Sequence, residues 1–144
     1  MRERLEGLSR GRVDAVFHAA AVSDFRFGKV WLRSAGGELS EIKSGKISTR
    51  EGTLLAELVP TAKIIAGLRG WFPRTRLFGW KFEADGGRAN AMLAAQKQLA
   101  DCATDFCVAN GPAYGRGFGL IGPDSQKHFA RAEKLFAALE KSIR

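Results

Sequence analysis

A short apolar run that leads into three alanines and then a Ser-Asp pair constrains the fold more than any other feature of this sequence. The segment covers residues 13–24 and reads VDAVFHAAAVSD. Its first part is apolar on both faces, which is typical of a strand in the middle of a parallel sheet. The alanines come at the carboxyl end of that strand, where open α/β sheets bind their ligands, and Asp24 follows them. The pattern predicts a buried strand beside a ligand site, but a core strand with a small-residue turn would read the same.

Length, charge and cysteine content narrow the class of protein. A chain of 144 residues fits a single domain, 1–144, with its own core. No apolar run approaches the ~20 residues of a membrane span and no signal-peptide core occurs, so we expect a cytoplasmic protein without a membrane partner. Cys102 and Cys107 lack metal or redox spacing and are expected to be small buried residues. The net charge of +8 is spread along the chain, which fits a phosphorylated small molecule at least as well as nucleic acid.

Alternating strand and helix patterns predict a three-layer α/β fold with a mostly parallel sheet, to which an antiparallel edge can be added. Strands are expected near residues 13–19, 53–59, 76–84 and 106–110, and helices near 61–72, 88–103 and 132–143. Thr61 is expected to cap the first of these helices. Residues 25–52 contain five glycines and are interpreted as irregular, with one strand at 29–32. An edge strand is expected at 127–130.

Polar residues stand at or after the ends of the predicted strands: Asp24, Lys46, Lys63, Lys81, Lys97 and Asn110. Lysines supply the charge that a triphosphate needs, although a single lysine is most often a solvated surface residue. The loop at 110–115 lacks the Gly-Lys-Ser/Thr ending of a Walker loop and is interpreted as a turn. His18 and His128 have no partner at metal or triad spacing and are interpreted as structural.

Five motifs occur in an order that resembles the phosphopantothenoylcysteine synthetase family. They are HAAAVSDF at 18–25, GKIST at 45–49, LVPTAKII at 58–65, FGWKFEAD at 78–85 and DFCVANG at 105–111. The resemblance implies a Rossmann-like fold and a ligase of coenzyme A biosynthesis. In that reaction CTP or ATP, with Mg²⁺, activates the carboxylate of 4'-phosphopantothenate as an acyl-nucleotide, and the amine of cysteine then forms the amide. It also implies a homodimer, and no flavin in this chain.

The resemblance assigns roles to particular residues. It places Ala19, Ala20 and Ala21 against the nucleotide, and Asp24 at the nucleotide and the metal. Lys46 corresponds to a flap lysine that contacts the triphosphate, and Trp80 to an aromatic residue near the base. The remaining nucleotide-binding residues are expected to be Ala62, Lys63, Ile64, Ile65, Lys81 and Lys97. Lys46, Asp24 and Asn110 are the predicted catalytic residues.

The sequence also departs from the family pattern. Ser48 and Thr49 replace two flap lysines, and the Gly-rich first half of the family's domain has no counterpart here. A ligase that works with a separate amino-terminal half is therefore the favoured interpretation. A reductase-like dinucleotide-binding protein is one alternative, although neither a G-x-G-x-x-G fingerprint nor a Tyr-x-x-x-Lys pair occurs. A non-catalytic module that binds nucleotides or nucleic acid is the other.

Overall fold

The computed structural model describes residues 1–20, 22–43 and 52–143, and the chain divides into two compact units. Unit 1 consists of Met1–Ala20 and Ile64–Arg144, and unit 2 of Ala21–Lys63. The chain expected as one domain is divided in this way because the strands of unit 2 pair with one another in a sheet of their own.

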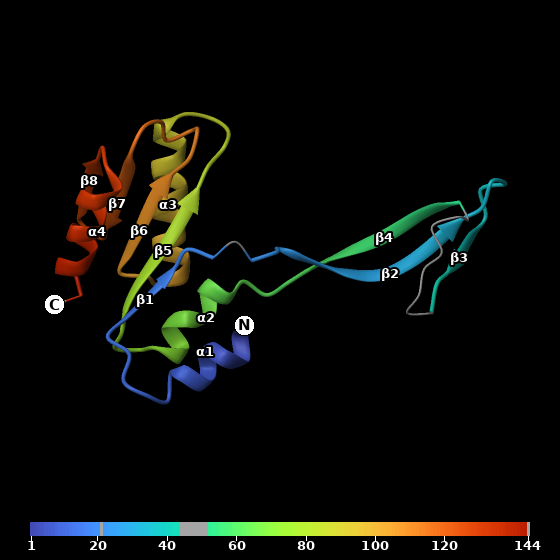
Figure 1. The fold of residues 1–144 in the computed structure, drawn as a ribbon, viewed down its shortest axis with the longest axis horizontal. Coiled ribbons are helices and arrows are strands. Elements are labelled where there is room, and N and C mark those ends of the chain that lie inside the picture. Colours follow the sequence, from blue (N-terminus) through green and yellow to red (C-terminus); the bar gives the residue numbers. More distant parts are fainter. Residues whose placement is uncertain (21, 44–51, 144) are drawn as a thin grey trace. The chain divides into compact units, whose positions relative to one another are not determined.

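Unit 1 is built on a five-stranded sheet with the order β1-β5-β6-β7-β8 (Figure 1). Its strands are β1 (Ala15–His18), β5 (Arg76–Phe82), β6 (Phe106–Asn110), β7 (Phe118–Gly122) and β8 (Ser125–Phe129). Strands β1, β5 and β6 are parallel, and β7 and β8 continue the sheet in antiparallel pairings. The predicted Rossmann-like α/β sheet with an antiparallel edge is confirmed.

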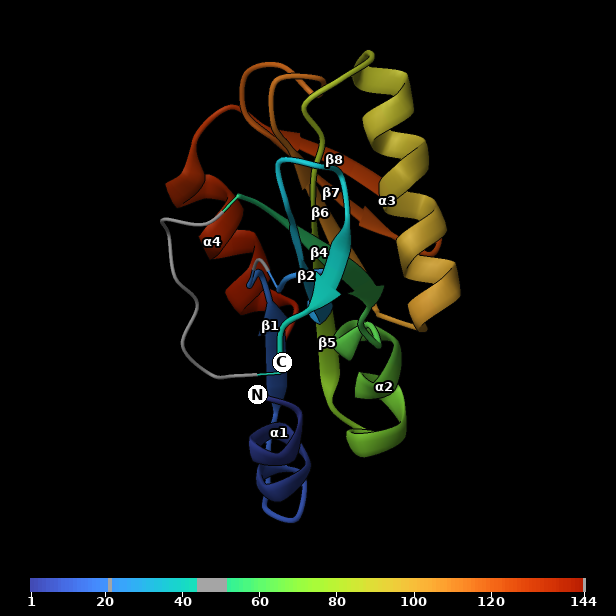
Figure 2. The same cartoon turned by 90° about the vertical axis from the view of Figure 1, so that its right-hand side faces the viewer.

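Helices cover both faces of this sheet, as predicted for three layers. The helices are α1 (Arg2–Leu8), α2 (Ile64–Trp71), α3 (Arg88–Cys102) and α4 (Ala132–Lys141). α3 and α4 lie on opposite sides of the sheet (Figures 1 and 2). Alternation along β6 supplies both cores, because Cys107 packs with Ala95 of α3 while Val108 packs with Leu135 of α4. Cys102 and Cys107 are both buried, as expected, and burial raises the pKa of the Cys107 thiol to about 12.

Unit 2 corrects the prediction for residues 25–60. The segment expected as a second parallel strand is β4 (Thr53–Pro60), which pairs antiparallel with β2 (Phe25–Arg33). β3 (Leu39–Glu41) completes a three-stranded sheet in the order β3-β2-β4. We call this three-stranded sheet the ribbon. Two of the glycines that made the region look irregular lie where the ribbon needs them. Gly37 has a φ of +89° in the turn between β2 and β3, and Gly28 lies at the bulge between Phe27 and Val30.

The expected cap of α2 is also corrected. α2 begins at Ile64, and the hydroxyl of Thr61 donates to the carbonyl of Ser23 over 2.7 Å instead of capping the helix. The Thr61 N–H donates to the carbonyl of Asp24 over 2.8 Å. Thr61 therefore extends the pairing of β2 with β4.

A hydrogen-bond network centred on Arg69 and Asp105 joins α2, β5 and β6 at the amino ends of the parallel strands. Arg69 donates to the carbonyls of Ala103 and Thr75 over 2.9 and 3.0 Å, and to the Asp105 carboxylate over 2.8 Å. That carboxylate also accepts the Leu77 N–H over 2.7 Å. Burial alone would raise the pKa of Asp105, but these hydrogen bonds and the positive charge of Arg69 outweigh it and lower the pKa from 3.8.

Candidate functional site

The carboxyl ends of β5 and β6 bring together two residues that the sequence analysis selected. The indole Nε1 of Trp80 donates to Oδ1 of Asn110 over 3.2 Å. Trp80 pairs with Val108 and Phe82 with Asn110, so the Trp80 and Asn110 side chains share one face of the sheet. Both residues are half-buried. The structure thus brings Trp80 and Asn110 together at this edge of the sheet.

Lys81 follows Trp80 on β5 and lies at the same carboxyl edge of the sheet as this pair. Strand alternation directs Lys81 to the other face of the sheet, where its ammonium lies 3.0 Å from the Glu83 carboxylate. The two side chains remain 38% and 28% exposed, so this ion pair is hydrated and contributes little to stability. Lys81 is therefore a charge at the carboxyl edge of the sheet that an anionic ligand can reach.

A hydrogen-bonded turn after β6 fixes the position of Asn110. The Glu83 N–H donates to the Asn110 carbonyl, and the Ala113 N–H donates to the Glu83 carbonyl, each over 3.0 Å. Gly111 has a φ of +111°, and a side chain there would collide with the Glu83 carbonyl. The loop expected to be a turn is a turn, and it anchors one of the predicted site residues.

The other predicted nucleotide-binding residues of unit 1 differ in how exposed their side chains are. Ala19 and Ala20 are exposed just beyond β1, whose last residue pairs with Gly79 of β5. The Ile65 side chain is buried in the core with Leu68 and Leu77, whereas the Ile64 side chain packs against that core and stays partly exposed. Lys97 is an exposed residue of α3, 3.0 Å from the Asp101 carboxylate.

The remaining predicted residues belong to unit 2 or lie outside the described residues. Asp24, Ala62 and Lys63 are exposed residues of unit 2. Ala21 and Lys46 fall outside the part of the chain that the structure describes. Asp24 belongs to a different unit from the Trp80–Asn110 pair, so the assignment of all three residues to one nucleotide site stays a prediction.

Neither histidine contributes to this site in the way a metal ligand or triad base would. His128 contacts Tyr114 and Arg88, whereas His18 Nε2 is buried without a hydrogen-bond partner among the described residues. Within the same residues, no group of three or more His, Cys, Asp or Glu is placed to hold a metal ion.

Sequence reasoning missed the residues that join α2, β5 and β6 at the opposite end of the strands from this site. Arg69 and Asp105 lie 36 residues apart in the chain, and neither belongs to a periodic pattern. Asp105 does open the DFCVANG motif, which was the one local signal for it. The structure explains that aspartate as an acceptor for the Leu77 N–H and the Arg69 guanidinium.

Comparison with known proteins identifies relatives of this chain, although no family model matches it. The chain is 34% identical to the coenzyme A biosynthesis bifunctional protein CoaBC of Thermococcus kodakarensis, over 99% of this chain and 35% of that protein. It therefore spans about a third of the length of this curated relative. No helix among the described residues is long and apolar enough to cross a membrane.

Three solved structures share the fold at 18% sequence identity. The DNA/pantothenate metabolism flavoprotein of Streptococcus pneumoniae matches with a TM-score of 0.77, over 98% of this chain and 66% of that one. The carboxy-terminal domain of a CoaBC protein matches with a TM-score of 0.64, over 99% and 59%. A Cab2 variant in complex with phosphopantothenate-cysteine matches with a TM-score of 0.57, over 87% and 42%. The chain is thus similar in sequence to part of a CoaBC protein, and it shares its fold with the carboxy-terminal domain of such a protein.

Proposed function

We propose that this chain is part of a phosphopantothenate–cysteine ligase of coenzyme A biosynthesis. The observation that carries the proposal is the Trp80–Asn110 pair, because it joins two of the five ordered motifs at the carboxyl edge of a parallel sheet. The relationship to CoaBC supports it, as does the shared fold with the Cab2 variant whose complex contains phosphopantothenate-cysteine. The reaction is proposed to take place in the cytoplasm.

The proposed chemistry has two steps that use charges of this chain. A carboxylate oxygen of 4'-phosphopantothenate attacks the α-phosphorus of CTP or ATP, a P–O bond forms, and the bond to pyrophosphate breaks. The amine of cysteine then attacks the acyl carbon, an amide C–N bond forms, and nucleoside monophosphate leaves as the amine loses a proton to solvent. Lys46, Lys63, Lys81 and Lys97 are proposed to stabilise the phosphate charge. Trp80 is proposed to stack on the base, and the Asn110 amide to orient the acyl group.

The residues present fit a Mg²⁺ ion that arrives with the triphosphate. Mg²⁺ is usually held by one or two carboxylates together with phosphate oxygens and waters, so a cage made only of protein is not required. The Asp24 carboxylate is exposed and makes no hydrogen bond or ion pair within the described residues. Asp24 is therefore proposed as the protein ligand, and the metal would neutralise phosphate charge there.

The role proposed for Lys46 is tested by replacing it. Lys46→Ala is expected to weaken binding of CTP or ATP by ~1.5–3 kcal/mol, because a charge-assisted hydrogen bond to phosphate is lost. Binding of the nucleosides cytidine and adenosine should not change. Isothermal titration calorimetry measures both, with Lys43→Ala as the matched control for charge on the same segment. Equal losses for nucleoside and triphosphate, or equal losses in the control, would contradict the role.

The sheet of unit 2 is proposed to mediate self-association. Phe27 lies opposite Leu58, and Phe25 opposite Pro60, so one face of the ribbon carries only apolar side chains at these positions. Beyond the bulge, the same face continues with Val30 opposite Ala56 and Leu32 opposite Leu54. Phe27 is 73% and Leu58 58% exposed, and an exposed apolar face of this kind marks an interaction surface.

We expect sedimentation to show a dimer that depends on this face. Replacing Phe27 and Leu58 together by serine should shift the chain toward the monomer, because the two apolar side chains would no longer be removed from water. Leu93→Ser is the control, since Leu93 is 66% exposed on α3 and belongs to unit 1. A strictly monomeric wild-type chain would refute the proposal.

A further inference from the structure

Three polar side chains from separate elements of unit 1 meet in a cluster that the proposed reaction does not use. Arg88 is the first residue of α3, Tyr114 lies in the turn after β6, and His128 is on β8. Nη2 of Arg88 is 2.8 Å from both the Tyr114 hydroxyl and Nδ1 of His128, and these two atoms are 3.0 Å apart. The guanidinium also lies over the Tyr114 ring, 4.5 Å from its centre. The guanidinium is therefore held in one orientation.

The hydrogen bonds assign the proton of His128. A guanidinium has donors only, so Nδ1 of His128 accepts from Arg88 and the neutral ring carries its proton on Nε2. Among the described residues, Nε and Nη1 of Arg88 and Nε2 of His128 have no protein partner. All the groups that remain in the cluster are therefore donors.

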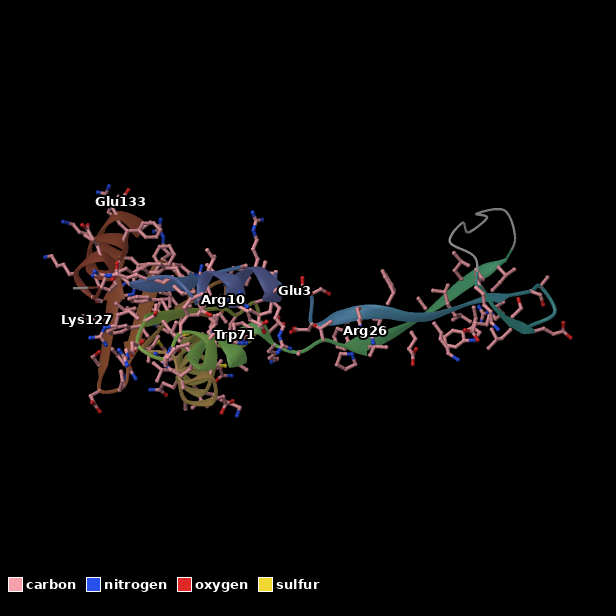
Figure 3. All side chains as sticks on the ribbon, turned by 90° about the horizontal axis from the view of Figure 1, so that it is seen from below. Glu3, Arg10, Arg26, Trp71, Lys127 and Glu133 are labelled. Atoms are coloured by element: carbon pink, nitrogen blue, oxygen red, sulfur yellow. The ribbon has the colours of Figure 1, made fainter. Side chains whose placement is uncertain are left out.

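These donors border a cavity of about 420 Å³, which is within the size range of small-molecule sites. Arg88, Ala89, Met92, Tyr114 and residues 126–128 line it, and none of them has a carboxylate. Elsewhere in unit 1, Arg69 and Arg131 pair with Asp105 and Glu133. Among the described residues, Arg88 donates only to neutral acceptors. Lys127, which Figure 3 labels at the surface of unit 1, adds a second positive charge. The cavity thus combines positive charge with donors that no acidic side chain satisfies.

We propose that this cavity binds a phosphate group, either as a free anion or at the end of a small phosphate monoester. Donors from three side chains suit a tetrahedral anion with several oxygens better than a planar carboxylate with two. The cavity is separate from the Trp80–Asn110 pair. Tyr114 packs in the core beneath α3, whereas Trp80 packs in the core beneath α4 on the other face of the sheet. The inference therefore does not depend on the proposed ligase activity.

Inorganic phosphate is the probe that tests this site. Increasing phosphate, with chloride adjusted to keep ionic strength constant, is expected to shift the His128 ring signals in the NMR spectrum along a saturable curve. Arg88→Gln should raise the apparent Kd for phosphate at least about tenfold, since the charged guanidinium and its hydrogen bonds to the phosphate oxygens are lost. Arg131→Gln removes the same charge from the surface outside the cavity, and its Kd should equal that of the wild type. Non-saturable shifts, or equal losses in the two variants, would overturn the proposal.

Two further measurements keep the test decisive. Lys127→Gln should also raise the Kd for phosphate. It decides the matter if Arg88→Gln does not fold, because the exposed Lys127 side chain makes no hydrogen bond or ion pair within the described residues. Acetate should bind at least about tenfold more weakly than phosphate at the same ionic strength, since it lacks the third and fourth oxygens. Equal binding of acetate would refute the assignment to phosphate. A phosphate monoester that shifts the same signals as free phosphate would extend the site to organic ligands.

Discussion

The 144-residue chain by itself is expected to give at least about 100-fold less ligation than the same chain supplied with the family's Gly-rich amino-terminal half. Nucleotide sites of doubly wound sheets draw on both halves of the sheet, and losing one preorganised group costs ~10²–10³ in rate. The chain spans only 66% and 59% of two structures that share its fold. The measurement is release of pyrophosphate from CTP or ATP with 4'-phosphopantothenate, followed by amide formation when cysteine is added.

We expect such a half to attach along strand β1. β1 is the terminal strand of the sheet and pairs only with β5, so its other backbone edge has no strand partner within the described residues. Phe17 of β1 stacks on Phe78 with ring centres 4.4 Å apart, yet it is 43% exposed. An open edge beside an exposed aromatic ring is a site for strand addition.

A variant of this edge provides the control for the activity measurement. Phe17→Ser should prevent rescue by the amino-terminal half, while Phe136→Ser, an equally apolar change at an exposed position of α4, should not. Robust turnover by the purified chain alone would refute the prediction. Absence of pyrophosphate release even with the added half would instead count against the ligase function.

Asp105→Ala is expected to lower the free energy of unfolding by about 2–4 kcal/mol. The substitution removes the acceptor of the Leu77 N–H and of the Arg69 guanidinium, and it leaves both donors partly buried without their partner. Chemical denaturation of unit 1 measures the effect. Asp101→Ala is the matched control, because Asp101 forms only an exposed ion pair with Lys97, and its loss should stay within about 0.5 kcal/mol.

The contribution of Asp105 should also depend on pH with a definite sign. Its pKa in the folded chain is lowered from 3.8, so the folded state favours the charged carboxylate more than the unfolded state does. The stabilisation is fully present above the unfolded pKa and is lost as the pH falls through the folded pKa. The difference between wild type and Asp105→Ala should therefore be constant near neutral pH and shrink below about pH 4. A difference that grew toward low pH would contradict this explanation.

Local pattern alone was sufficient for much of unit 1. Strands β5 and β6 and helix α3 were predicted within about two residues, because an apolar run, a turn and a helical period each leave a signal in neighbouring residues. The order of these elements then implied parallel pairing, since parallel strands need a long connection between them. The motifs placed Trp80 and Asn110 at the ends of adjacent strands, where the structure shows them hydrogen-bonded.

The tertiary structure alone decided which strands pair and which distant side chains meet. The apolar run of β4 fits a buried parallel strand and a strand of an exposed antiparallel sheet equally well. Its pairing with β2 is what makes it antiparallel. Arg69 and Asp105 are 36 residues apart, and Arg88 and His128 are 40 apart. No local period links residues at such distances, because their contacts exist only after the sheet and helices have packed. The sequence thus determined the elements and the candidate residues, and packing determined their partners.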